Sequence, residues 1–290
     1  MKIVGIVTVG TYPVPWLKYC LASIYHIVDR IIVVNSGYNF PYFTEYDHPL
    51  ADATHAIKQI DINGKIDEVQ HARFESCDLV QSEREGLRAL GGTFASEYAR
   101  KYSPEWLLQF DSDQVFFANV RNIHQLTTKD TDGYQFLQYL AYWITPWHCI
   151  PPELLSSYSD GAKFYRYGGK GGERQWWLGE GGIMNYREQK PCDLVTTAHF
   201  RECYPTPKGQ PPDYDSAFYY QFRRAMFHLF DRNRLHKLNQ SMQDIIVGAF
   251  NVAKEAVYER TKAGLFPAPI PPPEVVEIGP EKYVKEGFPK

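Results

Sequence analysis

This 290-residue chain lacks several features that would assign it at once to a class of protein. It has only five cysteines, an odd number with no CxxC spacing, so neither a disulfide framework nor a zinc knuckle is indicated. It has no run of basic residues and a formal net charge of −3, which argues against a protein that wraps duplex nucleic acid. No apolar stretch approaches the length of a membrane span, and the apolar run 3–9 is too short for a signal peptide. We therefore expect a cytoplasmic protein with no nucleic-acid partner.

The chain is rich in side chains that form cores. Hydrophobic residues make up 44% of it and aromatic residues 15%, which is enough to fill a sizeable core. As far as residue 117, apolar strands alternate with amphipathic helices. We expect strands at 3–9, 31–34, 56–62 and 106–110, helices at 17–27 and 82–101, and an irregular loop at 38–53. This alternation favours a nucleotide-binding α/β sheet whose strands are buried on both faces.

The rest of the chain has a different pattern, with Gly- and Pro-rich turns between short strands. We expect strands at 133–144, 162–167, 182–186 and 195–200, and helices at 215–236 and from 241 onward. The proline-rich segment from residue 266 is expected to be extended.

Two carboxylates stand at the end of the apolar strand 106–110. Asp111 and Asp113 are separated by Ser112, and apolar residues follow them. Ligands of an open α/β sheet bind at the carboxyl ends of its strands. Two hard oxygen donors at that place suit Mg²⁺ or Mn²⁺, above all when phosphate oxygens complete the shell. The sequence therefore predicts a divalent metal site; the alternative, a pair of carboxylates in a surface turn, is disfavoured by the apolar flanks.

Other short motifs occur in order with this one. They are the strand 3–9, Asn35-Ser36-Gly37 after the second strand, and Arg88-Ala89-Leu90-Gly91 in a helix. With Phe110-Asp111-Ser112-Asp113 they resemble the nucleotide-sugar half of GT-A glycosyltransferases, family 2 most closely, over roughly the first 120 residues. The resemblance implies an α/β fold of the GT-A, Rossmann-like type: a sheet flanked by helices, with a C-terminal helical extension. It divides the chain into a catalytic domain at 1–210 (nucleotide-sugar half 1–120, acceptor half 121–210), C-terminal helices at 211–265 and a proline-rich extended tail at 266–290.

The same resemblance implies a metal-dependent transferase that uses a nucleotide-diphosphate sugar, and its lean toward family 2 favours inversion. The nucleoside would be held by Thr8, Gly10, Thr11, Tyr12, Asn35, Ser36 and Gly37. Arg88 would face the diphosphate, although it could equally be a solvated helix residue. Asp111, with Ser112, would contact the sugar or ribose, while Asp113 and Asp111 bind the metal and His199 is the candidate third ligand.

One position departs from the family pattern. Family members commonly carry Asp where this chain has Asn35. An amide both donates and accepts hydrogen bonds, whereas a carboxylate only accepts them. The preferred nucleobase is therefore open.

The glycine-rich stretch 168–182 is the other unusual segment. Its seven glycines are typical of a mobile loop that closes over substrate, and it lacks the Lys-Ser/Thr ending of a phosphate-binding P-loop. Trp176 and Trp177 could stack on an acceptor sugar. An inverting transferase needs a base for the acceptor hydroxyl, and Glu180, or else Glu173, is the carboxylate available here. The competing interpretation is a surface loop with incidental charges.

The late helices combine aromatic and basic residues. These are Phe218, Tyr219, Tyr220, Phe222, Phe227, Phe230, Arg223, Arg224, Arg232 and Arg234. Such helices favour packing on the catalytic domain or on a second copy in a homo-oligomer. Peripheral contact with a membrane that presents a lipid-linked acceptor is the second interpretation; a soluble carbohydrate acceptor is equally open.

Rival functions are distinguished by motifs elsewhere in the chain. An apolar strand followed by Asp-Ser-Asp also resembles haloacid dehalogenase-like phosphohydrolases, with Asp111 as nucleophile. Those enzymes place the motif near the N-terminus and need a later Gly-Asp-x-x-x-Asp motif, which this chain lacks. A sugar-phosphate nucleotidyltransferase would carry a glycine-rich, Arg-containing loop after the first strand, where this chain has Gly10-Thr11-Tyr12-Pro13. A non-catalytic sugar-nucleotide-binding protein stays open because the catalytic base is ambiguous.

Overall fold

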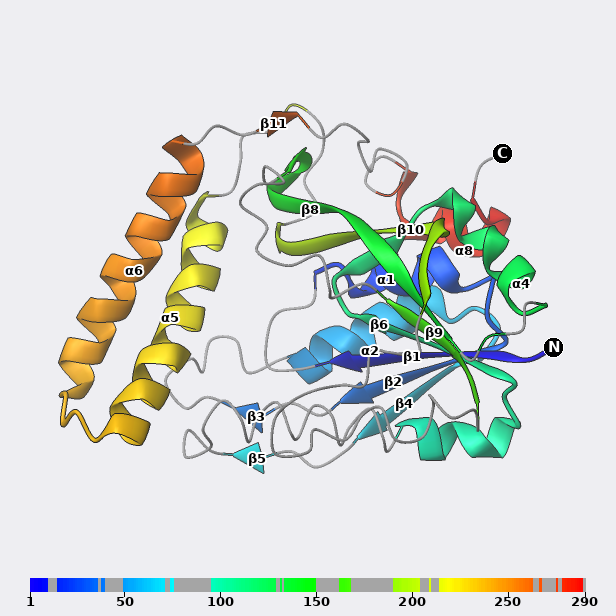
Figure 1. Cartoon of the computed structure of the whole chain (residues 1–290), viewed down its shortest axis with the longest axis horizontal. Helices are drawn as coiled ribbons and strands as arrows, with labels where there is room; N and C mark the ends of the chain where they lie inside the picture. The colour runs from blue at the N-terminus through cyan, green and yellow to red at the C-terminus, as the bar shows by residue number, and fades with distance from the viewer. Residues whose placement is uncertain are drawn as a thin grey trace.

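The computed structural model describes most of the chain. The described residues are 1–9, 15–35, 38–39, 49–70, 74–75, 95–128, 131, 133–149, 162–167, 190–203, 209, 214–262, 266–267, 275 and 278–288. They form a mixed α/β sheet flanked by helices, with a helical hairpin after it (Figure 1). This confirms the predicted fold class.

Four parallel strands form the first half of the sheet. Their order is β4–β2–β1–β6, with bounds Ile66–Gln70, Arg30–Asn35, Ile3–Val9 and Trp106–Asp111. Val9 is paired with Asn35, and Thr8 is paired with Asp111 on the other side of β1. The carboxyl ends of β2, β1 and β6 therefore lie together at one edge of the sheet.

The second half of the sheet is mixed. From β6 the order continues through β9 (Lys163–Arg166), β8 (Gly133–Cys149), β10 (Lys190–Cys203) and β7 (Gln114–Phe116). β9 is antiparallel to both of its neighbours, and β7 is antiparallel to β10. β7 begins three residues after the end of β6 and runs in the opposite direction. Because β10 pairs with β7, β10 lies beside the end of β6. A short strand, β11 (Phe266–Pro267), pairs with β8, and a separate two-stranded sheet joins β3 (Tyr38–Asn39) to β5 (Phe74–Glu75).

The main core lies between the sheet and the helices α1 (Leu17–Ile24), α2 (Pro49–Ile60) and α8 (Pro280–Glu286). Alternate residues of β1 point to this side, among them Ile3 and Val7, both fully buried. The short helical segments η3 (Ala118–Asn122) and α4 (Ile123–Leu126) cover the end of the same core. This layer supports the sheet edge that carries the site.

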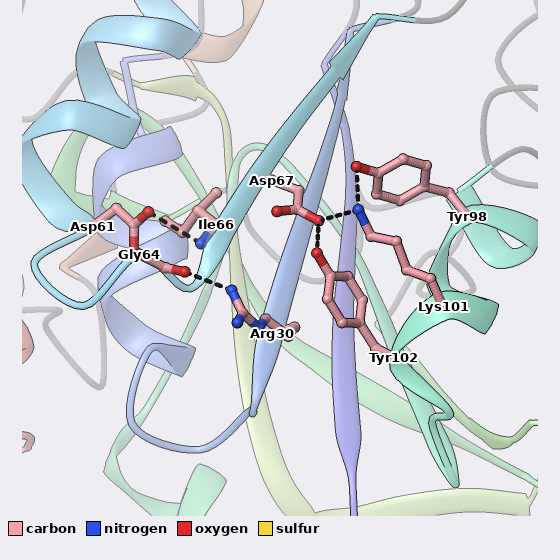
Figure 2. Close-up of polar contacts among 8 residues, drawn as sticks. All are labelled: Arg30, Asp61, Gly64, Ile66, Asp67, Tyr98, Lys101 and Tyr102. Atoms are coloured by element: carbon pink, nitrogen blue, oxygen red, sulfur yellow. Dashed lines mark hydrogen bonds and ion pairs between the residues drawn. The ribbon is translucent and has the colours of Figure 1, made fainter.

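The opposite face of the sheet is covered by a helical turn at 95–99 that continues as η2 (Arg100–Tyr102). Figure 2 shows how this segment is tied to β4: Lys101 Nζ lies 3.1 Å from Asp67 Oδ2, and the Tyr102 hydroxyl donates to the same carboxylate. Burial alone would lower the pKa of Lys101, but hydrogen bonds to Tyr98, Tyr102 and Asp67 raise it above its ordinary range. The ammonium therefore stays charged at neutral pH.

The turn between α2 and β4 fixes the start of that strand. Asp61 accepts hydrogen bonds from the backbone N–H of Lys65 (2.6 Å) and of Ile66 (3.1 Å). Figure 2 shows the second of these bonds and the one that Arg30 donates to the Gly64 carbonyl. Gly64 has a φ of 61°, the left-handed conformation that glycine adopts readily.

The predicted strand at 56–62 is wrong, as is the predicted loop over its last part, 49–53. Helix α2 occupies Pro49–Ile60, and the strand of this region is β4, at Ile66–Gln70. The buried residues Ala53, Ala56, Ile57 and Ile60 have the i, i+3, i+4, i+7 spacing of one helix face. The isoleucines at positions 57, 60 and 62 suggested a strand, but Ala53 and Ala56, which precede them, complete a helical stripe with Ile57 and Ile60.

The expectation of an extended tail also needs a correction. Residues Pro280–Glu286 form α8, which packs against α1 with Tyr283 and Val284 buried. His26 is hydrogen-bonded to the Val284 carbonyl, and Arg121 donates to the Phe288 carbonyl. Proline at the first position of α8 starts the helix, because proline needs no N–H partner there.

Two long helices follow the sheet. α5 (Tyr214–His236) and α6 (Met242–Lys262) form a hairpin that stands beside the body of the molecule in Figure 1. Met226, Ile245 and Ala249 form its inner contact. Its outer surface leaves apolar side chains exposed, among them Val247 and Phe250 of α6. Within the described part of the chain, none of the helices is long and apolar enough to cross a membrane. Contact of this hairpin with a second copy or with a membrane surface stays a prediction.

Candidate metal and nucleotide site

The candidate site is built on the turn that joins β6 to β7. Asp111 is the last residue of β6, and its backbone N–H donates to Gln114 Oε1 at 3.0 Å. The carbonyl of Asp113 accepts a hydrogen bond of 2.8 Å from the backbone N–H of Phe200 in β10. These contacts fix both ends of the turn, so the two carboxylates project from a rigid mount.

Strand β10 delivers an imidazole to the same place. His199 is paired with Gln114 across the β10–β7 ladder, and its Nε2 lies 2.9 Å from Asp113 Oδ1. One donor atom from each of Asp111, Asp113 and His199 lies within 4.8 Å of the others. His199 is 8% exposed and both carboxylates are partly buried, so the group is only partly open to solvent. Two carboxylates and one imidazole form a donor set that suits Mn²⁺ or Mg²⁺ bound together with phosphate oxygens.

Two buried side chains in and next to α1 contact the site, one at the β6–β7 turn and one at β10. The Cys20 thiol donates to the Ser112 carbonyl at 3.0 Å. Trp16, directly before α1, stacks on Phe200 with ring centroids 3.9 Å apart. Both side chains are fully buried. α1 is therefore linked to both parts of the site, the β6–β7 turn and the end of β10.

The Cys20 thiol should be unreactive in the folded protein. Burial raises its pKa well above the ordinary value, and the charges of Asp113 and Asp111 raise it further. Because the thiolate is the reactive form, we expect iodoacetamide at pH 8 to leave Cys20 unmodified until urea unfolds the chain. Mass spectrometry of the Cys20 peptide measures this, with the urea-treated sample as the control. Native-state labelling at the rate of a free thiol would contradict the packing described here.

Asn35 lies on the same edge of the sheet, at the end of β2. Its Nδ2 donates to Glu68 Oε1 in β4 at 2.7 Å, and the Thr54 hydroxyl of α2 donates to that same oxygen at 2.7 Å. Asn35 is only 4% exposed. Its Oδ1 is buried and has no hydrogen-bond partner among the described residues.

The residues predicted for the site divide into two groups. Thr8, Asn35, Asp111, Ser112, Asp113 and His199 are described, and strand pairing places them along one edge of the sheet. The others, Gly10, Thr11, Tyr12, Ser36, Gly37, Arg88, Glu173, Trp176, Trp177 and Glu180, lie outside the described residues, as does the strand expected at 182–186. Their roles stay predictions.

Sequence reasoning missed three residues that shape this edge. Glu68 was not considered because β4 itself was not predicted, and Ile66-Asp67-Glu68-Val69 carries only a weak strand signal. Cys20 lies in the helix predicted at 17–27 and Trp16 directly precedes it, and neither was predicted to contact the site. Nothing in their local sequence indicates their partners, which come from segments about 90 and 180 residues away.

Comparisons with known proteins find similar structures but no matching sequence. No protein-family profile matches the chain, and no curated protein matches its sequence. Among solved structures it is similar to the inositol-1-phosphate CTP transferase from T. maritima, with a TM-score of 0.42, 10% identity, and coverage of 69% of this chain and 89% of that one. It is also similar to a protein described as a glucose-1-phosphate thymidylyltransferase from Bacillus anthracis, with a TM-score of 0.35, 10% identity, and coverage of 57% and 72%. A third is HddC from Yersinia pseudotuberculosis, with a TM-score of 0.35, 14% identity, and coverage of 68% and 89%.

The TM-scores of these three structures lie between 0.35 and 0.42, too low to decide which reaction this chain performs. The first two names describe nucleotidyl transfer, and that reaction is stated of those two proteins only.

Proposed function

We propose that this chain is a metal-dependent glycosyltransferase that moves a sugar from a nucleotide-diphosphate sugar to a carbohydrate or lipid-linked acceptor, with inversion. The observation that carries the proposal is the grouping of Asp111, Asp113 and His199 at the carboxyl end of β6. That edge of an α/β sheet is where nucleotide ligands bind. A leaving nucleoside diphosphate accumulates negative charge, and a divalent cation offsets that charge as a Lewis acid.

The chain's own groups have separate tasks in this proposal. Asp113 and His199 hold the ion, and Asp111 either holds it or contacts the sugar or ribose. The buried edge around Asn35 takes the nucleoside, assisted by the segments 10–12 and 36–37 and by Arg88. Glu180, or else Glu173, removes the proton from the acceptor hydroxyl, and Trp176 and Trp177 bind the acceptor sugar.

Glycosyl transfer is preferred to nucleotidyl transfer for one reason in the sequence. A nucleotidyltransferase is expected to carry a glycine-rich loop with an arginine after its first strand, whereas Gly10-Thr11-Tyr12-Pro13 has one glycine and no arginine. The two reactions also give different products. Nucleotidyl transfer releases pyrophosphate from a triphosphate, whereas glycosyl transfer releases a nucleoside diphosphate from a sugar donor.

Calorimetry tests the proposal directly. We expect one of UDP-, GDP- or dTDP-sugars to bind with Mn²⁺ or Mg²⁺ and to lose its binding in chelator. The matching nucleoside triphosphate with a sugar phosphate, assayed for pyrophosphate, is the comparison. Absence of metal-dependent binding across the panel would refute the proposal, and pyrophosphate release would replace it with nucleotidyl transfer.

A further inference from the structure

The side chain of Asn35 is held in one orientation by its neighbours. Glu68 Oε1 accepts two hydrogen bonds, from Asn35 Nδ2 and from the Thr54 hydroxyl, each of 2.7 Å. An ionised carboxylate has no proton to donate, so only the NH₂ side of an amide can face it favourably. The opposite orientation would set the amide oxygen against the carboxylate and would lose a charge-assisted hydrogen bond. Glu68 therefore decides which end of the amide faces away from β4.

Within the part of the chain that the structure describes, the end that faces away is an acceptor without a donor. Asn35 Oδ1 is buried, with no partner among the described residues, and the whole residue is 4% exposed. Buried polar atoms in proteins are hydrogen-bonded in the great majority of cases, because an unmet one costs free energy. A bound ligand with an N–H or O–H donor would satisfy this oxygen.

The position of the acceptor points to the class of ligand. Asn35 ends β2 and is paired with Val9 at the end of β1, while Thr8 is paired with Asp111 at the end of β6. The acceptor and the candidate metal group thus share one edge, separated by the single strand β1. A metal on the diphosphate at β6 would leave the nucleoside to extend along this edge toward β2.

We propose that Glu68 is a positioning residue: it locks the Asn35 amide so that Oδ1 serves as a dedicated acceptor for a ring N–H of the nucleobase. This inference rests on the proposed function, because it takes the bound ligand to be a nucleotide. Uracil, thymine and guanine carry such an N–H on the edge that a protein reads, whereas cytosine and adenine have a bare acceptor nitrogen there. With the amide held in this orientation, the bare ring nitrogen of cytosine or adenine would face Asn35 Oδ1, so that two acceptors would oppose each other. Because Glu68 fixes the orientation of the amide, Asn35 presents only an acceptor oxygen to the ligand, as a carboxylate would.

Binding of four diphosphates tests the proposal: UDP, GDP, CDP and ADP, titrated with Mn²⁺ into the whole chain. For the wild type we expect UDP or GDP to bind at least about tenfold more tightly than CDP and ADP, since each 1.4 kcal/mol is a factor of ten. In Glu68→Gln the new amide can either donate or accept, so Asn35 is free to turn over. We expect the preference to fall to within about threefold, because an Asn35 amide that can turn over offers the base either a donor or an acceptor. Glu97→Gln, an exposed Glu on the far face of the sheet, is the matched control and should keep the wild-type preference.

A double variant separates positioning from simple damage. Asn35→Asp combined with Glu68→Gln exchanges the roles: the carboxylate moves to position 35 and the donor amide to position 68. Their mutual hydrogen bond is retained, and position 35 again presents only acceptors. We expect this pair to regain the preference lost in Glu68→Gln, which a merely destabilised strand edge would not do. Urea unfolding of each variant confirms that the chains compared are folded.

The outcomes separate this inference from the proposed function. Metal-dependent binding of all four diphosphates with equal affinity would overturn the acceptor role of Asn35 and leave the transferase proposal intact. An unchanged preference in Glu68→Gln would overturn the positioning role alone. Failure of every nucleotide to bind the wild type would overturn both proposals.

Discussion

Replacing Asp113 with Asn should remove metal-dependent nucleotide binding while leaving the fold intact. Asp113 contacts His199 and belongs to the group that could hold the ion, so the change takes one negative charge from a site with two carboxylates. Loss of a partner that merely orients a metal ligand costs roughly 10–100-fold in metal affinity, and loss of a direct ligand should cost at least as much. Titration of Mn²⁺ followed by electron paramagnetic resonance measures this, and calorimetry with the donor nucleotide measures the consequence.

The stability of Asp113→Asn distinguishes metal binding from a structural role. Asp113 is partly exposed, and the contact from the turn to β10 is made by its backbone carbonyl, which the substitution keeps. We therefore expect the free energy of unfolding without metal to change by less than about 1 kcal/mol. Asp193→Asn, an exposed carboxylate on the same strand as His199, is the matched control and should bind metal normally. Wild-type Mn²⁺ affinity in Asp113→Asn would eliminate the metal role.

The parts of the fold that could be predicted are those in which local pattern and tertiary environment agree. The strand expected at 3–9 is β1, and the strand expected at 106–110 ends one residue later as β6. Both are apolar runs in the parallel half of the sheet, which is covered on two faces, so hydrophobicity alone identifies them. β4 is an edge strand with exposed polar residues, so its apolar pattern is weak. The strand was therefore predicted at the isoleucines that precede it, most of which belong to helix α2.

The same distinction applies to the site. Sequence reasoning could place Asp111 and Asp113 together because they are two residues apart at a strand end. It could suggest His199 only through the family resemblance. The contact between Asn35 and Glu68 depends on the register of β2 against β4, which pairs Val33 with Glu68. Register is set by packing over whole strands, so no short motif in this chain could have indicated the amide lock.

Replacing Trp16 with Ala should destabilise the protein severely and weaken the metal site at the same time. Trp16 is among the largest fully buried side chains, and substitutions of this kind cost about 3–5 kcal/mol. Its ring lies against Phe200, the neighbour of His199 in β10, with centroids 3.9 Å apart. Without this contact, β10 can shift relative to α1 and carry the imidazole away from Asp113. Urea unfolding gives the first effect, and Mn²⁺ affinity measured under conditions where the variant is still folded gives the second.

Two further variants decide whether Trp16 positions the site or only stabilises the core. Trp16→Phe keeps an aromatic ring that can stack on Phe200 but leaves a cavity, so stability should be partly lost while Mn²⁺ affinity stays near the wild-type value. Leu235→Ala, at a side chain that is 61% exposed on the outer hairpin, should change neither quantity. If Trp16→Ala loses stability but binds Mn²⁺ as the wild type does, the stack on Phe200 does not position His199. In that case the imidazole is held by other contacts of β10, among them its ladders with β7 and β8 and the contact with Asp113.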